Sequence, residues 1–149
     1  MCCRNRWRRQ IYASAISILK NINDECCLDS AKPVGKVITN DHIPFEIKRV
    51  CWLYDVPGGE MRGGHAFQNQ QEVIIALSGS FDVVLNDGQE EKVFALNRSY
   101  FALYVPKMIW RHIENFSTNS LAFIASDNEY NEDAYIRDFE EFRKKANNE

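Results

Sequence analysis

The fold is decided by residues 59–79, which read GEMRGGHAFQNQQEVIIALSG. Within this stretch, Glu72 is followed by an apolar run that continues to Leu77, and such a run is typical of a buried strand. Gly79 ends the run, because glycine favours turns. His65 and Phe67 are two residues apart, so in a strand their side chains face the same side of the sheet.

Short apolar runs separated by turn residues flank this stretch on both sides. The further strands that we expect are 45–56, 81–85, 92–96, 100–105, 109–116 and 121–126. Asn86-Asp87-Gly88 joins two of them as a hairpin, because Asn and Gly tolerate positive φ angles. Strands with this length and spacing predict an all-β antiparallel sandwich or barrel rather than alternating strands and helices.

The C-terminal part has a different pattern. Ile136, Phe139 and Phe142 recur at helical spacing. Asn131 is the expected N-cap, and the acidic residues that follow it suit the positive end of a helix dipole. We therefore expect a C-terminal helix that begins near residue 131 and packs against the sheet.

Composition narrows the classes of function. The 149 residues suffice for one ordinary domain, and 18 Lys+Arg against 21 Asp+Glu give a net charge of −3. This balance argues against a general nucleic-acid or anionic-membrane binder. Any histidine chemistry must use His42, His65 or His112, since there are no others.

The N-terminal residues differ from the rest of the chain. The first twenty carry several basic residues and no acidic one, and the apolar stretch 11–19 is far shorter than the ~20 residues of a membrane span. We assign 1–33 to a basic extension outside the core and 34–149 to a single domain, with a signal or transit peptide as the alternative. The five cysteines are odd in number and contain no C-x-x-C pair, which favours a reducing compartment, the cytoplasm.

The spacing within residues 59–79 resembles the first motif of the cupins, G-x5-H-x-H-x(3,4)-E-x6-G. Gly59, His65, Glu72 and Gly79 match it, whereas Phe67 stands where the second histidine belongs. The resemblance implies a cupin jelly roll, the double-stranded β-helix.

A partial match to the second cupin motif lies further along the chain. Pro106 and Asn115 match its spacing, and Arg111 occupies the position of its histidine ligand. Of four expected metal ligands only His65 and Glu72 remain, and stable zinc or iron sites normally need three or more. We therefore expect no metal and no other cofactor.

Three blocks, taken together, resemble one branch of the cupins. They read RGGHAFQNQQEVIIALSGSFDVVLNDG, LNRSYFALYVPKMIWRHIENFS and ASDNEYNEDAYIRDFEEF. Over about residues 35–142 the chain is similar to the dTDP-4-keto-6-deoxyglucose 3,4-ketoisomerases, the WxcM-like cupins. The resemblance implies a metal-independent enzyme of surface-polysaccharide biosynthesis that takes a dTDP-linked keto sugar and forms homodimers by exchanging N-terminal strands.

The chemistry that this resemblance implies is a carbonyl shift from C4 to C3 of the sugar through an enediol(ate). Imidazole both takes and gives protons near neutrality, so His65 is the expected base. Phe67 cannot transfer a proton, so Tyr54, Tyr104 or a water would serve as the relay. The alternatives are an isomerase altered in rate or substrate, and a cupin that binds a nucleotide sugar or another small ligand without turning it over.

Five further residues are candidates for substrate binding. They are Arg62, Gln71, Glu72, Arg111 and Asn115. Arg62 suits a diphosphate or the enediolate, because arginine binds phosphate in a bidentate manner. Without a metal, Glu72 is expected to pair with an internal Arg or His. Arg111 and Asn115 are expected to share an inward strand face, where they bind ligand or hold each other.

Overall fold

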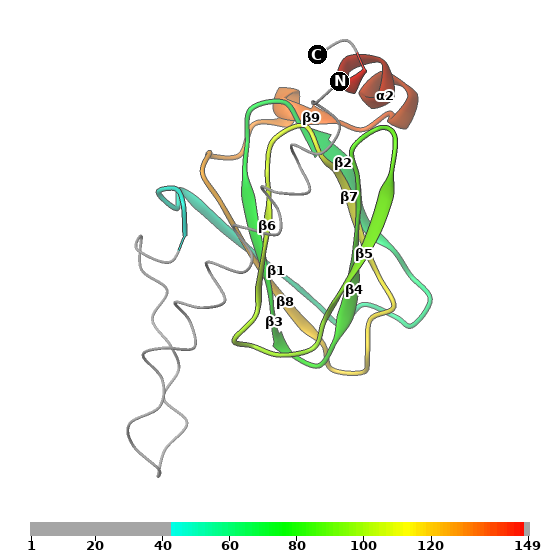
Figure 1. The fold of residues 1–149 in the computed structure, drawn as a ribbon. Helices are drawn as coiled ribbons and strands as arrows, with labels where there is room; N and C mark the ends of the chain where they lie inside the picture. Colours follow the sequence, from blue (N-terminus) through cyan, green and yellow to red (C-terminus); the bar gives the residue numbers. More distant parts are fainter. Residues whose placement is uncertain (1–42, 148–149) are drawn as a thin grey trace, which may run out of the picture.

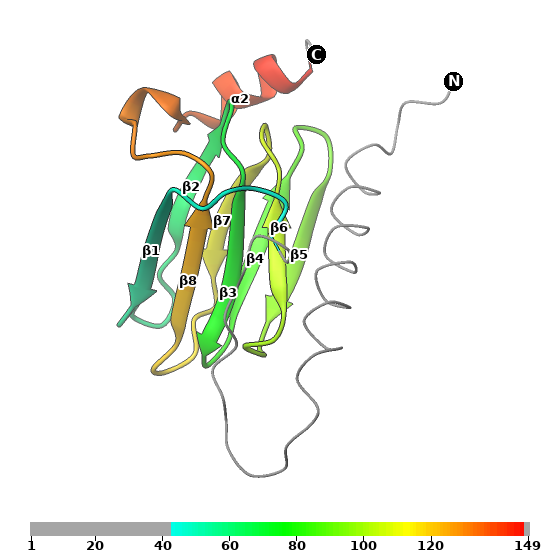
Figure 2. The same cartoon turned by 90° about the vertical axis from the view of Figure 1, so that its left-hand side faces the viewer.

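The computed structural model describes residues 43–147, which fold into two antiparallel sheets that face each other (Figures 1 and 2). One sheet has the order β1-β8-β3-β6, and the other has the order β5-β4-β7-β2-β9. The strands are β1 (Arg49–Tyr54), β2 (Arg62–Phe67), β3 (Glu72–Ser78), β4 (Phe81–Asn86), β5 (Glu91–Leu96), β6 (Ala102–Val105), β7 (Trp110–Glu114), β8 (Leu121–Ser126) and β9 (Tyr135–Ile136). A 3₁₀ turn, η1 (Glu132–Ala134), and one helix, α2 (Phe139–Ala146), complete the described part. This architecture confirms the predicted jelly roll with a C-terminal packing helix.

The apolar run of β3 is buried because both of its faces are covered. Ile74 belongs to the core between the two sheets, together with Phe81, Ile113 and Ile124. The neighbouring residues Val73 and Ile75 lie on the outer face, where Ile43, Phe45 and Ile47 pack over them. Two buried faces explain why this strand is apolar throughout instead of alternating.

Helix α2 covers the outer face of β2 and β9 at one end of the sandwich (Figure 1). Ala66, Ile136 and Phe142 form its buried contact. The Asp138 side chain caps the helix, because its Oδ1 accepts a hydrogen bond from the Glu141 amide at 2.7 Å.

The predicted start of this helix was wrong. Asn131 caps η1 instead, and Ile136 lies in β9, which pairs with β2. The helix begins only at Phe139. Pairing with an open strand edge satisfies the backbone of Tyr135–Ile136, so long-range pairing overrode the local helical spacing.

Several expected strands are shorter than their sequence patterns. The strand expected over 45–56 is confined to β1, and Asp55, with a φ of 53°, follows its last residue. The strand expected over 109–116 ends at Glu114, before Asn115 with a φ of 54°. The hairpin at residues 86–88 is confirmed, with a φ of 94° at Gly88 between β4 and β5.

The predicted boundary at residue 33, the basic extension and His42 lie outside the described residues. Within residues 43–147, no helix is both long and apolar enough to cross a membrane.

Candidate active site

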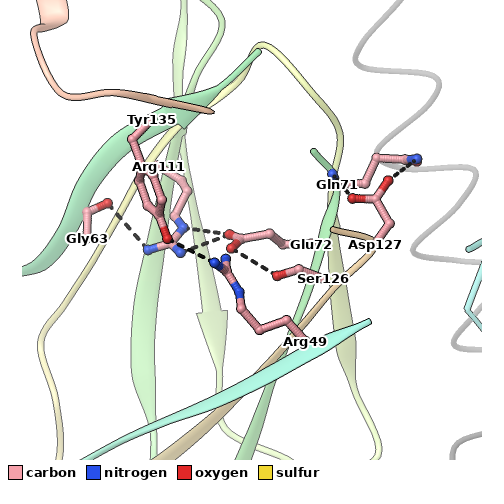
Figure 3. Close-up of polar contacts among 8 residues, drawn as sticks. All are labelled: Arg49, Gly63, Gln71, Glu72, Arg111, Ser126, Asp127 and Tyr135. Carbon is pink, nitrogen blue, oxygen red and sulfur yellow. Dashed lines mark hydrogen bonds and ion pairs between the residues drawn. The ribbon is translucent and has the colours of Figure 1, made fainter. Parts of the chain in front are cut away.

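A buried ion pair joins the two sheets at the centre of the site (Figure 3). Arg111 on β7 donates from Nε at 2.9 Å to Glu72 Oε2 on β3, and its Nη2 lies 2.8 Å from the same oxygen. Only 6% of the Arg111 side chain and 2% of the Glu72 side chain are exposed. Ser126 Oγ donates to the other Glu72 oxygen at 3.4 Å. The expectation that Glu72 pairs with an internal Arg or His is confirmed, with Arg111 as the partner.

A glycine makes room for this arginine. Gly63 O accepts a hydrogen bond from Arg111 Nη1 at 3.4 Å, and Gly63 has a φ of 75°. A Cβ at this position would overlap Arg111 Nη1. The register of β2 against β7 also shifts between Arg62 and His65. Glycine thus allows β2 to bend closely around the guanidinium.

His65 lies beside the ion pair, directly across the β2–β7 ladder from Arg111. Its imidazole is buried, with 7% exposure, and its Nε2 has no hydrogen-bond partner among the described residues. The His65 and Phe67 ring centroids are 4.8 Å apart, so the predicted shared face is confirmed. Tyr135 on β9 contacts both rings, at 4.9 Å from His65 and 4.5 Å from Phe67.

Burial, together with the positive charges of nearby arginines, lowers the pKa of His65 from 6.5 to about 3. Burial has the largest effect on this pKa, followed by Arg111, Arg137 and Arg49 in that order. The imidazole is therefore neutral across the physiological pH range, and a neutral imidazole is the form that accepts a proton.

The depressed pKa predicts an acid-sensitive fold. Below pH 6.5, His65 becomes protonated in the unfolded chain but stays neutral in the folded chain. Protonation therefore favours the unfolded state, and His65 lowers the free energy of unfolding as the pH falls towards 3. We expect His65 to account for about 2–3 kcal/mol of lost unfolding free energy between pH 6.5 and 4.5. Urea titrations at both pH values should show this loss in the wild type and a smaller loss in His65→Gln. Equal losses in the two proteins would contradict a neutral buried His65.

Two residues of the site, Arg49 and Tyr135, belong to no motif that was recognised in the sequence. Arg49 Nη1 donates to Tyr135 Oη at 3.2 Å, across 86 residues of chain. The Arg49 guanidinium also lies 6.0 Å from the centroid of the Phe67 ring and 5.7 Å from that of Tyr130. One signal could have identified Arg49. It occupies the inward position of β1, where Cys51 and Leu53 pack against the core.

Gln71 and Tyr104 lie on the other side of the four-stranded sheet from His65. Tyr104 Oη donates to Gln71 Oε1, and Gln71 Nε2 donates to Asp127 Oδ2 at 2.9 Å. Burial and, secondarily, the Asp127 charge raise the pKa of Tyr104. Figure 3 shows Gln71 and Asp127 pointing away from Glu72. Adjacent strand residues face opposite sides, which separates Gln71 from Glu72.

Three other expected site residues also lie apart from His65 in this chain. Tyr54 is 67% exposed at the end of β1 opposite Arg49. The partly exposed Arg62 pairs with Glu60 at 3.1 Å. Asn115 is exposed and donates to Asp82 Oδ2 at 2.8 Å. The expectation that Asn115 shares an inward face with Arg111 was wrong, because the strand ends at Glu114.

The donor set does not suit a metal ion. Phe67 offers no ligand atom, and the Arg111 guanidinium occupies the space beside Glu72 with a positive charge. No group of three or more His, Cys, Asp or Glu within residues 43–147 is placed to hold a metal. We therefore derive no chemical step through a metal at this site.

Comparisons with known proteins identify relatives over most of the chain. The family model FdtA, described as WxcM-like, C-terminal, matches residues 14–147. A TDP-4-oxo-6-deoxy-alpha-D-glucose-3,4-oxoisomerase of Aneurinibacillus thermoaerophilus is 34% identical over 125 residues, covering 84% of this chain and 90% of that protein.

Solved structures give the same family. A 3,4-ketoisomerase from Helicobacter canadensis is 38% identical, with a TM-score of 0.72 over 75% of this chain and 84% of that one. QdtA, a sugar 3,4-ketoisomerase from Thermoanaerobacterium thermosaccharolyticum in complex with TDP, is 29% identical, with a TM-score of 0.74 over 76% and 82% of the chains. This chain belongs to the WxcM-like family of sugar 3,4-ketoisomerases.

Proposed function

We propose that this protein moves the keto group of a dTDP-linked 4-keto-6-deoxyhexose from C4 to C3, without a metal. One observation carries the proposal: a neutral, buried His65 with an unpartnered Nε2 faces a cluster of guanidinium groups. The family supports it, because the curated relative is named as a TDP-4-oxo-6-deoxyglucose 3,4-oxoisomerase and one solved relative binds TDP.

In this mechanism His65 Nε2 removes the proton from C3 of the sugar. The electrons of the C3–H bond form a C3–C4 double bond, and the C4 carbonyl becomes an enediolate oxygen. The positive charges of Arg111, Arg137 and Arg49 oppose an isolated imidazolium, as the lowered pKa of His65 indicates. The same charges stabilise the negative enediolate that forms with it. His65 then returns the proton to C4, while the C3 hydroxyl loses its proton to form the C3 carbonyl and the C4 oxygen gains a proton to form the hydroxyl.

The ion pair between Glu72 and Arg111 has a positioning role in this proposal. It holds the Arg111 charge at a defined place across the ladder from His65. Within residues 43–147, no hydrogen bond, ion pair or ring contact joins His65 to Arg62, Gln71, Asn115, Tyr54 or Tyr104. A role in substrate binding or proton relay is therefore a proposal for each of them.

The direct test is incubation with dTDP-4-keto-6-deoxyglucose in deuterated water, with and without a chelator, followed by NMR. We expect the 3-keto product to form and deuterium to enter the sugar, at the same rate with chelator. Tight binding without deuterium incorporation would contradict the isomerase and favour the second candidate, a cupin that only binds a nucleotide sugar. Phe67 is the observation that favours that candidate, because it replaces a proton-transferring residue.

We further propose that the protein forms a homodimer and acts in the cytoplasm. The outer face of β1 supports the dimer, because Val50, Trp52 and Tyr54 are 40%, 51% and 67% exposed there. Adjacent exposed apolar side chains are typical of an interface. β1 itself pairs with β8 of the same chain, and any exchanged strand before it lies outside the described residues.

Trp52→Glu should break this dimer. A buried tryptophan at an interface typically contributes 2 kcal/mol or more, so we expect the dimer dissociation constant to rise by about 30-fold or more. Light scattering over a dilution series measures the effect. Val93→Glu is the matched control, because Val93 is 55% exposed on β5 of the other sheet. A dimer unchanged by Trp52→Glu would place the interface elsewhere.

A further inference from the structure

The proposed ketoisomerase reaction, on which this inference rests, needs two proton movements. One proton moves between carbons, from C3 to C4. The other moves between oxygens, from the C3 hydroxyl to the C4 oxygen. A single imidazole at His65 can carry the first. The second needs another group that both donates and accepts, and the Phe67 ring beside His65 cannot do either.

Tyr135 is a group of this kind, and its ring contacts the Phe67 ring. It lies directly opposite Phe67 in the β2–β9 ladder, with 4.5 Å between the ring centroids. Its ring is also 4.9 Å from the His65 imidazole. Within residues 43–147 it is the tyrosine whose ring packs against His65. Tyr54 and Tyr104 lie on the outer face of the other sheet.

The contact with Arg49 leaves the phenol free to donate. Arg49 Nη1 is the donor and Tyr135 Oη is the acceptor, at 3.2 Å, so the Tyr135 hydrogen is available to another oxygen. A negative charge formed on Tyr135 Oη would lie against the Arg49 guanidinium. The Arg137 guanidinium carbon is also 4.7 Å from the centroid of the Tyr135 ring. A hydrogen bond from the Arg49 guanidinium to a Tyr135 phenolate would be charge-assisted, and such bonds are stronger than those between neutral groups.

We propose that Tyr135 is a catalytic residue that carries the proton between the two sugar oxygens. After His65 has removed the C3 proton, Tyr135 Oη gives its proton to the C4 oxygen of the enediolate and becomes a phenolate held by Arg49. The phenolate then takes the proton of the C3 hydroxyl. The C3 carbonyl forms, and the electrons of the C3–C4 double bond take the proton back from His65 to make the C4–H bond. Both side chains return to their starting states.

The test separates the two proton movements in Tyr135→Phe. Deuterated water and dTDP-4-keto-6-deoxyglucose are used, and NMR follows deuterium entry at C3 of the substrate together with formation of the 3-keto product. We expect product formation to fall by about 10²-fold or more, because a general acid–base group is lost. Exchange at C3 should persist within about tenfold of the wild type, because His65 is intact.

Tyr130→Phe is the matched control. Tyr130 is a neighbouring tyrosine, with its ring centroid 6.0 Å from that of Tyr135, and it is 64% exposed. Its variant should isomerise at the wild-type rate. Thermal unfolding of Tyr135→Phe should show a folded protein, since only one hydrogen bond to Arg49 is removed.

A second variant tests whether Tyr135 carries the proton between the sugar oxygens, which Phe67 cannot do. In the Phe67→His background the new imidazole can move the oxygen-bound proton, so adding Tyr135→Phe should cost at most about tenfold there. A loss as large as in the wild-type background would overturn the proposal. It would also be overturned if exchange and product formation fell together in Tyr135→Phe, or if neither fell.

Failure of the underlying function has a different signature. If the wild type neither exchanges deuterium nor forms product while it binds the sugar nucleotide, the ketoisomerase itself is contradicted and the role of Tyr135 falls with it. If the wild type isomerises and Tyr135→Phe isomerises equally well, only the role of Tyr135 is contradicted.

Discussion

His65→Asn should reduce 3,4-isomerisation by at least about 10³-fold, near the upper end of what a general acid–base residue contributes. Asparagine is a smaller polar residue that cannot accept the C3 proton. Deuterium entry at C3 should be lost with product formation, in contrast to the pattern expected for Tyr135→Phe. The rates are measured by NMR in deuterated water, and TDP affinity by calorimetry should stay within a few-fold of the wild type.

His112→Asn is the control for this substitution. His112 is the next residue along β7 from Arg111, with its side chain 22% exposed and Nε2 at 3.5 Å from Glu114 Oε2. Because it faces away from the site, its loss should leave the rate unchanged. Residual isomerisation in His65→Asn within tenfold of the wild type would contradict His65 as the base. A fall of the same size in His112→Asn would show that the effect is not specific to the site.

Arg111→Met should destabilise the protein by about 3–5 kcal/mol, because it leaves Glu72 buried and without its partner. Methionine replaces much of the apolar stem, so the loss reports mainly the uncompensated carboxylate. Urea unfolding at pH 7 measures the change in unfolding free energy. Arg62→Met is the matched control, since the Arg62 pair with Glu60 is exposed and such pairs contribute about 0–1 kcal/mol.

The double variant Arg111→Met with Glu72→Leu completes this experiment. Replacing both partners with apolar residues removes the buried charge as well as its neutraliser, and such replacements are often close to neutral in stability. We therefore expect the double variant to regain most of the stability lost in Arg111→Met. Losses that simply add in the double variant would show that Glu72 and Arg111 do not stabilise the fold as a pair.

The positions that the sequence predicted correctly are those set by local rules. The two-residue period of a strand places His65 and Phe67 on one face, and it turns His112 away from Arg111. The absence of metal donors around Glu72 made an internal Arg or His its expected partner. Local rules were less successful at strand ends. The apolar pattern extended two strands too far, whereas β1 and β7 end just before Asp55 and Asn115, which have positive φ angles.

The expected relay residues illustrate the limit of this kind of reasoning. Tyr104 belongs to a block shared with the family, but its hydroxyl bonds to Gln71 on the outer face of the sheet. The local spacing predicts a helix that includes Tyr135, whereas Tyr135 pairs with β2 and contacts His65. A spacing within one segment predicts its face, but it does not predict which distant segment will pair with it.

The sequence alone therefore predicts the jelly roll, the family, His65 as the proposed base, and Phe67 beside it. The surroundings of His65 depend instead on contacts between strands that are distant in the chain. Arg49 and Tyr135 are 86 residues apart in the chain, and they meet because β1 belongs to one sheet and β9 to the edge of the other. Which distant strands lie side by side depends on the free energy of the whole sandwich, so the spacing of residues within one segment does not predict it.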